Sequence, residues 1–331
     1  MALKSFKKPS QIKQGLKIAI YGENGTGKSL IAMQFPNALL IDSESKSGTY
    51  LNRKGYSDNV VGVADTSDYY QTIDLMKEIL DEKEKPCDTL IVDSETKIYE
   101  SLSVSCMETE EKRALKQKKD PSDATVSMRG YGKIKLNTQR LSSLRSQASA
   151  RGITYISICH VEDVFSGKGE DRVKIGEKMA NRKGSEFDYD LIIKTMKQKD
   201  LGSGKLTYIA IIEKDTTGCF KLGEKIDYTW TGDVPVDMFY TRLKDRISTS
   251  SEGTKDSSYT SVDSVIKKAM DESASNDEII EEFTKLFKEK GANEENKAKI
   301  SQLLISNGIK SYKDEATIDK LKLVIEEMKT M

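Results

Sequence analysis

The chain has 331 residues, of which 32% are charged and 37% hydrophobic, and its formal net charge is zero. This length allows two domains or one large domain with appendages, and no apolar run approaches the length that crosses a bilayer. The first eleven residues lack the apolar segment of a secretory signal, and the four scattered cysteines form no C-x-x-C pair. We therefore expect a cytoplasmic protein, in a bacterial host cytosol, with reduced thiols and no membrane partner.

The charge is unevenly distributed along the chain. Residues 251–331 contain 13 lysines and 17 acidic residues, a net charge of −4, so the first 250 residues carry +4. This balance permits a nucleic-acid partner without arguing for one. Residues 1–15, which hold four lysines, are predicted to form an extended N-terminal arm. A frayed terminus is a simpler interpretation of that arm than a DNA contact.

A glycine-rich stretch, GENGTGKS, follows the apolar run Leu16–Tyr21 and precedes an apolar stretch typical of a first helical turn. This is the pattern and the strand–loop–helix context of a phosphate-binding loop. Glycines let the backbone approach an anion, and the amide N–H groups and the helix N-terminus then point at it. A glycine-rich turn before a helix is the alternative interpretation. The predicted nucleotide-binding residues are Gly22, Glu23, Asn24, Gly25, Thr26, Gly27, Lys28, Ser29 and Leu30.

Two side chains of this stretch would act on ATP directly. Lys28 supplies a positive charge for the outer phosphates, and the Ser29 hydroxyl is placed to ligate Mg²⁺. We therefore predict ATP and Mg²⁺ as the ligands of the site.

Two later apolar runs end in acidic residues. Residues 38–41 precede Asp42, Ser43 and Glu44, and residues 89–92 precede Asp93. Working residues of open α/β sheets lie at the carboxyl ends of the strands. Glu44 is therefore predicted to polarise a water against the γ-phosphate, and Asp93 to hold the Mg²⁺ shell with Ser29. A solvated strand end is the alternative interpretation of Glu44.

The only histidine, His160, follows a third apolar run at residues 153–159. A polar side chain at this point commonly senses the γ-phosphate, so we predict a sensor role for His160. A neutral surface or capping residue is the alternative. Apolar residues at helical spacing predict helices within residues 66–83 and 131–147.

Two lysine-rich segments are candidates for contact with a nucleic-acid backbone. Residues 107–129 are typical of a solvated helix and loop interrupted at Pro121, with a basic flap as the alternative. Residues 161–189 contain four glycines and many basic residues, and they are predicted to form a long loop. Loops of this length are uncommon unless they are functional or disordered, so a DNA contact and a flexible excursion both stay open.

The remaining chain is predicted to hold two hairpins and a helical region. Residues 190–195 and 206–212 flank a Gly-Ser-Gly turn, and a second hairpin is predicted to continue through residues 219–222, before Tyr228 and Trp230. The core would then span residues 16–246, with a flexible linker at 247–258 and a helical domain at 259–331. Three amphipathic helices are expected in that domain, around Phe283, around Leu303 and around Val324, the first capped by Asn276 or Asp277.

The order of these motifs resembles the RecA-type recombinase core. Its water-activating glutamate matches Glu44 in LIDSE, and its Asp-Ser pair matches Asp93 and Ser94 in IVDS. The chain looks most like the phage RecA-like single-strand-annealing recombinases, often described as phage nucleotide-binding AAA-type ATPases. A histidine commonly ends the sensor strand in that group, as in Ile158-Cys159-His160, whereas RecA proteins usually have glutamine. The resemblance covers about residues 16–230.

The resemblance also implies a fold and further residues. It implies an α/β P-loop NTPase with a mostly parallel central sheet flanked by helices, to which a small C-terminal helical region is added. In the RecA fold, lysines near the position of Lys214 reach the nucleotide of the neighbouring subunit, which makes Lys214 a predicted catalytic residue. Thr216 stands where a second basic residue is expected.

The function we expect is that of an ATPase acting on single-stranded DNA in phage recombination, by annealing or strand pairing. The expected partners are single-stranded DNA, further copies of the chain in a ring or filament, and a single-strand-binding protein. Two alternatives stay open: an ATPase module that loads or regulates a replication partner, and a nucleotide-dependent switch that contacts protein only.

Overall fold

The computed structural model describes residues 14–52, 58–167, 171–199, 202–229, 238–247, 278–309, 311–312 and 317–330. The chain divides into two compact units, Met1–Tyr259 and Thr260–Met331. Most of the predicted N-terminal arm, Trp230, the predicted cap at Asn276 or Asp277 and nearly all of the predicted linker lie outside the described residues.

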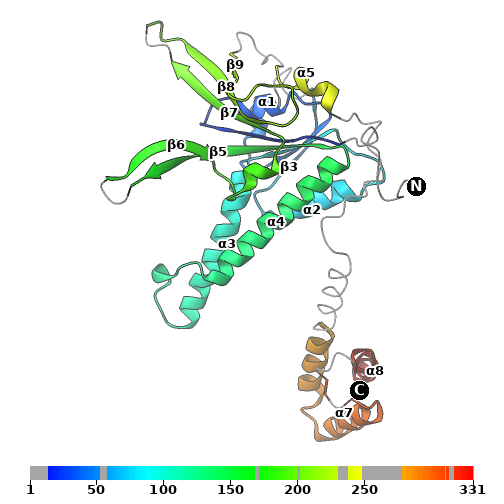
Figure 1. The fold of residues 1–331 in the computed structure, drawn as a ribbon. Coiled ribbons are helices and arrows are strands. Elements are labelled where there is room, and N and C mark those ends of the chain that lie inside the picture. Colours follow the sequence, from blue (N-terminus) through cyan, green and yellow to red (C-terminus); the bar gives the residue numbers. More distant parts are fainter. Residues whose placement is uncertain are drawn as a thin grey trace, which may run out of the picture. The chain divides into compact units, whose positions relative to one another are not determined.

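The first unit is built on one twisted, mostly parallel sheet with the order β3-β2-β4-β5-β1-β7-β8-β9 (Figure 1). The first six strands of that order are mutually parallel, whereas β7–β8 and β8–β9 pair antiparallel. This confirms the predicted fold class. The strands are β1 (Lys17–Gly22), β2 (Ala38–Asp42), β3 (Val60–Asp65), β4 (Thr89–Asp93), β5 (Thr154–Ser166), β7 (Leu191–Lys199), β8 (Leu206–Asp215) and β9 (Lys225–Asp227).

The register aligns the carboxyl ends of four strands. Gly22 of β1 pairs with His160 of β5, and Asp42 of β2 pairs with Asp93 of β4. Asp93 in turn pairs with Ile158, so β5 lies between the strand before the glycine-rich loop and the strand that ends in Asp93. One edge of the sheet therefore gathers the motifs that are far apart in the sequence.

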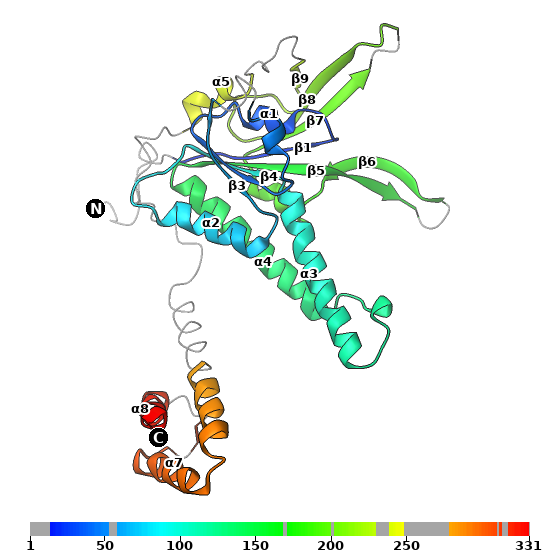
Figure 2. The ribbon, with the colours of Figure 1, turned by 180° about the vertical axis from the view of Figure 1, so that it is seen from behind.

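Helices cover both faces of this sheet (Figure 1 and Figure 2). One face packs against α1 (Lys28–Ala32) and α5 (Tyr240–Leu243) around a core that includes Ile20 and Ile158. The other face packs against three longer helices through a second apolar cluster. These helices are α2 (Tyr69–Asp81), α3 (Glu95–Lys116) and α4 (Met128–Ala150). The side chains of Asp68, Ser94 and Ser127 cap them by accepting a hydrogen bond from a backbone N–H of the first turn.

The segment predicted as a long loop at residues 161–189 is instead mostly a hairpin. Strand β5 continues past His160 and pairs antiparallel with β6 (Val173–Met179), which forms the β5–β6 ribbon (residues 161–167 and 171–179). The prediction was wrong because glycine and lysine content outweighed the short alternation of Val173 and Ile175. The ribbon and the β7–β8 hairpin both extend beyond the edge of the sheet where β1 ends (Figure 1).

Three smaller expectations are also corrected. Residues 219–222 form no strand, and the hairpin partner of β8 is β9. Strand β3 was not predicted, although residues 60–64 (VVGVA) are an apolar run that ends in an acid, as in β2 and β4. It lies at the edge of the sheet with Val61 and Val63 exposed. Gly15 was assigned to the arm, but its N–H donates to the carbonyl of Ser149, and the Ser149 hydroxyl donates to the Gly15 carbonyl.

The second unit is a small helical bundle, as expected. Residues 278–290 are helical and are followed by α7 (Glu294–Ser306) and α8 (Ile318–Thr330). Phe283, Ile300, Leu321 and Ile325 form its core. Helix α7 ends at Asn307 and Gly308, the latter with a left-handed φ of 67°.

All four cysteines are free thiols. Within the described ranges, no helix combines the length and the apolar character that spanning a membrane requires.

Candidate active site

The glycine-rich stretch forms a tight loop between β1 and α1. Gly25 and Gly27 adopt left-handed φ values of 72° and 78°, and α1 begins at Lys28. Gly22 has a φ of 152°, and a Cβ there would lie 2.1 Å from the carbonyl oxygen of Thr195. The close approach of β7 therefore requires glycine at this position.

Residues of β7 and of the segment after β9 hold the glycine-rich loop by hydrogen bonds. The hydroxyls of Thr26 and Thr195 lie 2.7 Å apart in a buried hydrogen bond. Tyr228 donates a hydrogen bond to the carbonyl of Thr26 at 2.5 Å, and Lys197 donates to the carbonyl of Asn24 at 3.0 Å. These contacts hold the loop backbone in place, which lowers the cost of ordering it around an anion.

A cavity of about 710 Å³ opens between this loop and the carboxyl ends of β2, β4 and β5. Its volume falls in the usual range for small-molecule sites. Of the nine residues predicted to bind nucleotide, Glu23 and Thr26 do not line the cavity. The structure brings together the predicted residues Gly22, Asn24, Gly25, Gly27, Lys28, Ser29, Leu30, Glu44, Asp93 and His160.

Ser29 and Asp93 meet directly, although they are far apart in sequence. The Ser29 hydroxyl donates to Oδ2 of Asp93 at 2.5 Å. Burial and the charges of Glu44 and Asp42 raise the pKa of Asp93, the Ser29 hydrogen bond and the Lys28 charge oppose them, and the net result is a pKa of about 6. The positive charge of Lys28 therefore compensates this carboxylate only in part.

This arrangement fits Mg²⁺. Within the described part of the chain, no three His, Cys, Asp or Glu residues are grouped to hold a metal ion by themselves. Mg²⁺ is commonly bound by only one or two protein oxygens together with phosphate oxygens and waters. A hydroxyl and an undercompensated carboxylate on the wall of the cavity are such a set, so Ser29 and Asp93 are the residues that would hold the ion.

Glu44 is held by three neighbours. Its Oε1 lies 2.5 Å from Nε2 of His160 and accepts a hydrogen bond from the Ser94 hydroxyl at 3.1 Å. Its Oε2 lies 2.5 Å from Nζ of Lys46. Burial raises the pKa of Glu44, but the bonds from Lys46, His160 and Ser94 outweigh burial and lower that pKa to about 2. A carboxylate that is so weakly basic is better suited to orienting a water molecule than to removing its proton.

Asp42 shapes the turn that presents Glu44. Its carboxylate accepts hydrogen bonds from the N–H of Glu44 at 2.9 Å and from the N–H of Ser47 at 2.7 Å. The Ser43 hydroxyl donates to the carbonyl of Ser94 at 2.8 Å and so joins the ends of β2 and β4. The sequence analysis gave Asp42 no role, although a buried acid at a strand end is a signal for one.

Other residues of the cavity were also missed. Lys46, Thr49 and Tyr50 contribute from the segment after β2, and Ile158 and Val161 contribute from β5. The sequence contains no motif that marks them, because the turn after Glu44 folds back over the cavity through the Asp42 hydrogen bonds.

Lys214 lies outside the cavity of its own chain. It pairs with Ile192 near the start of β7, at the end of the sheet opposite the glycine-rich loop. Its ammonium donates to the carbonyls of Glu186 at 2.9 Å and Phe187 at 3.3 Å. That Lys214 contacts the nucleotide of a neighbouring subunit stays a prediction.

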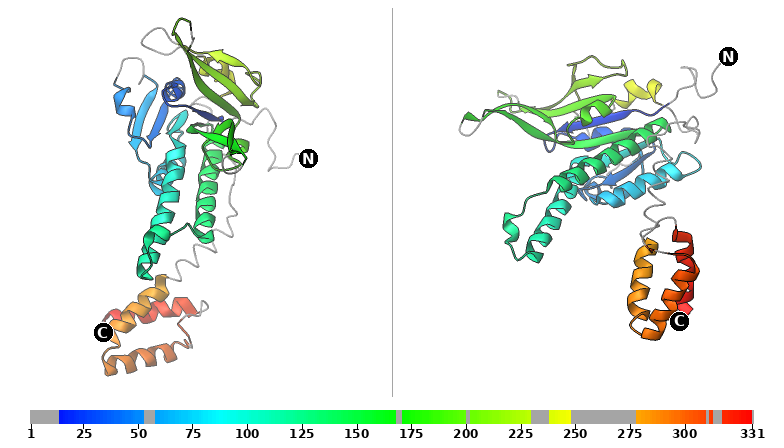
Figure 3. Two further views of the ribbon diagram at one scale, coloured as in Figure 1. Left: turned by 90° about the vertical axis from the view of Figure 1, so that its left-hand side faces the viewer. Right: turned by 60° about the horizontal axis from the view of Figure 1, so that its bottom comes forward.

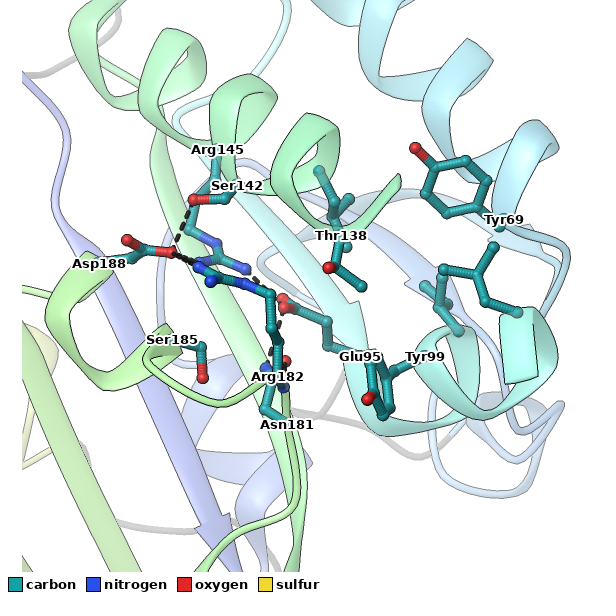
Figure 4. Close-up of a pocket in the computed structure, with 13 residues that line it drawn as sticks. Tyr69, Glu95, Tyr99, Thr138, Ser142, Arg145, Asn181, Arg182, Ser185 and Asp188 are labelled. Atoms are coloured by element: carbon teal, nitrogen blue, oxygen red, sulfur yellow. Dashed lines mark hydrogen bonds and ion pairs between the residues drawn. The ribbon is translucent and has the colours of Figure 1, made fainter. Parts of the chain in front are cut away.

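A buried charge cluster lies directly after the end of β4 (Figure 4). Glu95 follows Ser94 directly, and its Oε1 lies 2.5 Å from Nη2 of Arg145 on α4, with side-chain exposures of 3% and 2%. Glu95 also accepts hydrogen bonds from Ser157 at 2.7 Å and Asn181 at 3.0 Å. The end of β4 is thereby bound to α4, to β5 and to the segment that leaves the ribbon.

Comparison with known proteins extends this description. Residues 14–216 match the protein family described as the AAA domain, and this span includes every residue that lines the cavity. A KaiC-like protein from the hyperthermophilic archaeon Pyrococcus horikoshii is similar at 14% identity with a TM-score of 0.41, and the similarity covers 67% of this chain and 89% of that one. No curated protein matches the chain.

Loss of the Glu95 charge should destabilise the first unit. Glu95→Gln leaves the buried guanidinium of Arg145 without its closest partner, and we expect the free energy of unfolding to fall by about 3–5 kcal/mol in urea titrations followed by circular dichroism. The double variant Glu95→Gln/Arg145→Met should recover part of this loss.

Glu100→Gln is the matched control. Glu100 lies on the same helix in an exposed ion pair with Lys97, so its loss should cost less than about 1 kcal/mol. A Glu95→Gln variant as stable as this control would contradict a structural role for the buried pair.

Proposed function

This chain belongs to the AAA domain family, and from that premise we propose that it binds ATP with Mg²⁺ and hydrolyses the γ-phosphate. The observation that carries the proposal is the contact between Ser29 and Asp93 within the cavity that Lys28 and Glu44 also line. A phosphate loop, a metal-binding pair and a carboxylate for the attacking water are the parts that phosphoryl transfer to water requires.

Each residue has a distinct task in this proposal. The Lys28 ammonium, which donates to the carbonyls of Gly22 and Glu23, lies at the mouth of the loop, where it would bind the outer phosphates. Burial lowers the pKa of Lys28, and the charges of Asp93 and Glu44 oppose that shift. Bound Mg²⁺ would supply positive charge to the phosphate oxygens as they become more negative. Glu44 would orient the water, with His160 fixing its carboxylate.

We further propose that the protein acts on single-stranded DNA in phage recombination, by annealing or strand pairing, as a homo-oligomer. The resemblance to RecA-like single-strand-annealing recombinases at Glu44, Asp93 and His160 supports this substrate. The hydrogen bond between the His160 N–H and the Thr96 hydroxyl at 3.0 Å, and that from the Thr96 hydroxyl to the Ala180 carbonyl at 2.7 Å, tie the cavity to the exit of the ribbon. Such contacts offer a path by which nucleotide state would affect a projecting element.

Lys28→Ala should abolish turnover. Removal of the ammonium leaves the outer phosphates uncompensated, and we expect the rate of phosphate release to fall by roughly a hundredfold or more. Lys77→Ala is the control, since Lys77 is exposed on α2 and pairs only with Asp74 among the described residues. Turnover that survives in Lys28→Ala at the level of Lys77→Ala would show that the site is assigned wrongly.

Glu44→Gln should separate binding from chemistry. The amide keeps the size of the side chain but loses the charge that orients water, so hydrolysis should fall by roughly 10²–10⁴-fold while ATP affinity, measured by calorimetry, stays within about threefold. A loss of ATP binding instead would make Glu44 a structural residue.

Single-stranded DNA should stimulate hydrolysis by the full chain and bind with an affinity that falls steeply with salt, because neutralised phosphates release counterions. Phosphate release with and without oligothymidylate, and anisotropy of a labelled oligonucleotide with ATP present, test this directly. An active ATPase that binds no DNA at low salt would leave hydrolysis in place and favour a role in loading a protein partner.

A further inference from the structure

All the charged residues of helix α4 are basic. Its 23 residues contain no aspartate or glutamate but five basic residues. Arg145 is buried against Glu95, whereas the other four, Arg129, Lys133, Lys135 and Arg140, are exposed. Within the part of the chain that the structure describes, the side chains of these four form no ion pair and no hydrogen bond, although the charge of Lys133 acts on Glu110.

Three of the four form a straight row. Arg129, Lys133 and Arg140 are separated by four and seven residues, which places them on one side of an α-helix. The row is about 16 Å long at 1.5 Å per residue. Lys135 and Tyr131, the latter 59% exposed, lie on the opposite side of the helix, because positions 131 and 135 are roughly half a turn away from the row at 3.6 residues per turn. The row is therefore purely cationic.

Acids on the neighbouring helix compensate this row only in part. Glu108 pairs with Lys112 at 3.9 Å, and Glu110 pairs with Arg113 at 2.6 Å, both within α3. Hydrogen bonds from Ser127 and Arg113 lower the pKa of Glu110, and the charge of Lys133 lowers it further. Helices α3 and α4 lie side by side and extend as a pair beyond the sheet (Figure 1 and Figure 3). The row is therefore accessible to a large polyanion.

The described cations of the ribbon, by contrast, already have partners. Lys174 contacts Asp163 and Glu177, each at 2.7 Å, and Lys178 lies 3.6 Å from Glu162. The guanidinium of Arg172 covers the Phe165 ring at 4.1 Å. A phosphate that binds there must compete with these partners, which weakens the earlier interpretation of residues 161–189 as the DNA contact.

We propose that the row on α4, formed by Arg129, Lys133 and Arg140, binds the phosphate backbone of single-stranded DNA. This inference rests on the proposed function, for which it names the surface. Exposed cations in such a row neutralise successive phosphates. Arg145 connects the inner side of the same helix to Glu95, next to Ser94, and thus to the nucleotide site.

The test compares two variants of the full chain. One replaces the three cations of the row on α4 (R129Q/K133Q/R140Q), and the matched control replaces three cations of the ribbon (R172Q/K174Q/K178Q). Binding of labelled oligothymidylate is measured by anisotropy across a salt series with ATP and Mg²⁺. DNA-free ATP hydrolysis and urea unfolding show whether each variant is folded.

The α4 variant should bind DNA roughly tenfold or more weakly, and its log–log salt slope should be less steep by up to about 2, at about 0.7 for each lost phosphate contact. The ribbon variant should bind as the wild type does, and DNA-free hydrolysis should be unchanged in both.

Other outcomes overturn the inference in different ways. If the ribbon variant loses affinity as much as the α4 variant or more, α4 is not the surface, although the proposed function stands. If the wild type hydrolyses ATP but binds no oligothymidylate, both the surface and the DNA function fail. If the α4 variant keeps DNA affinity but no longer binds phosphatidylserine vesicles that the wild type binds, the face is a membrane contact instead.

Discussion

The hydrogen bond between Ser29 and Asp93 depends on the order and register of the sheet. Ser29 lies on α1, which follows β1, and Asp93 ends β4. Strand β5 lies between β1 and β4, with Gly22 paired to His160 and Asp93 paired to Ile158. A one-residue slip of β4 would turn Asp93 to the other face of the sheet and remove the carboxylate from the cavity. The buried aliphatic strands that fix this register therefore determine the chemistry, although none of their side chains touches a phosphate.

Buried contacts next to the cavity connect the end of β4 to the helices. Glu95 and Thr96 follow the Asp93–Ser94 pair immediately, and they contact Arg145 of α4 and the segment that leaves the ribbon. Replacing such a buried pair by apolar residues is often neutral for stability. In this protein the pair joins three elements that surround one site, so its geometry constrains where α3 begins and how α4 lies against the sheet.

The sequence was most informative where the signal is local. The glycine-rich loop, the acids at strand ends and the amphipathic helices depend on neighbouring residues, and the structure places them as predicted. It was least informative where partners are distant. Thr195 and Tyr228 hold the loop from more than 160 residues away, and Lys46 reaches Glu44 only because Asp42 folds the turn. The absence of acids on α4 is visible in the sequence, but only the structure shows that, among the described residues, Arg129, Lys133 and Arg140 form no ion pair, whereas Lys174 and Lys178 of the ribbon do.

Strand β5 runs from the sheet into the ribbon, and His160 lies within it. No loop separates the cavity from the described part of the ribbon, and the pairing of β5 with β6 shifts register between Val164 and Phe165. Between His160 and this bulge the backbone is a continuous strand, so a change in the position of the ribbon there would move the imidazole of His160 relative to the Glu44 carboxylate.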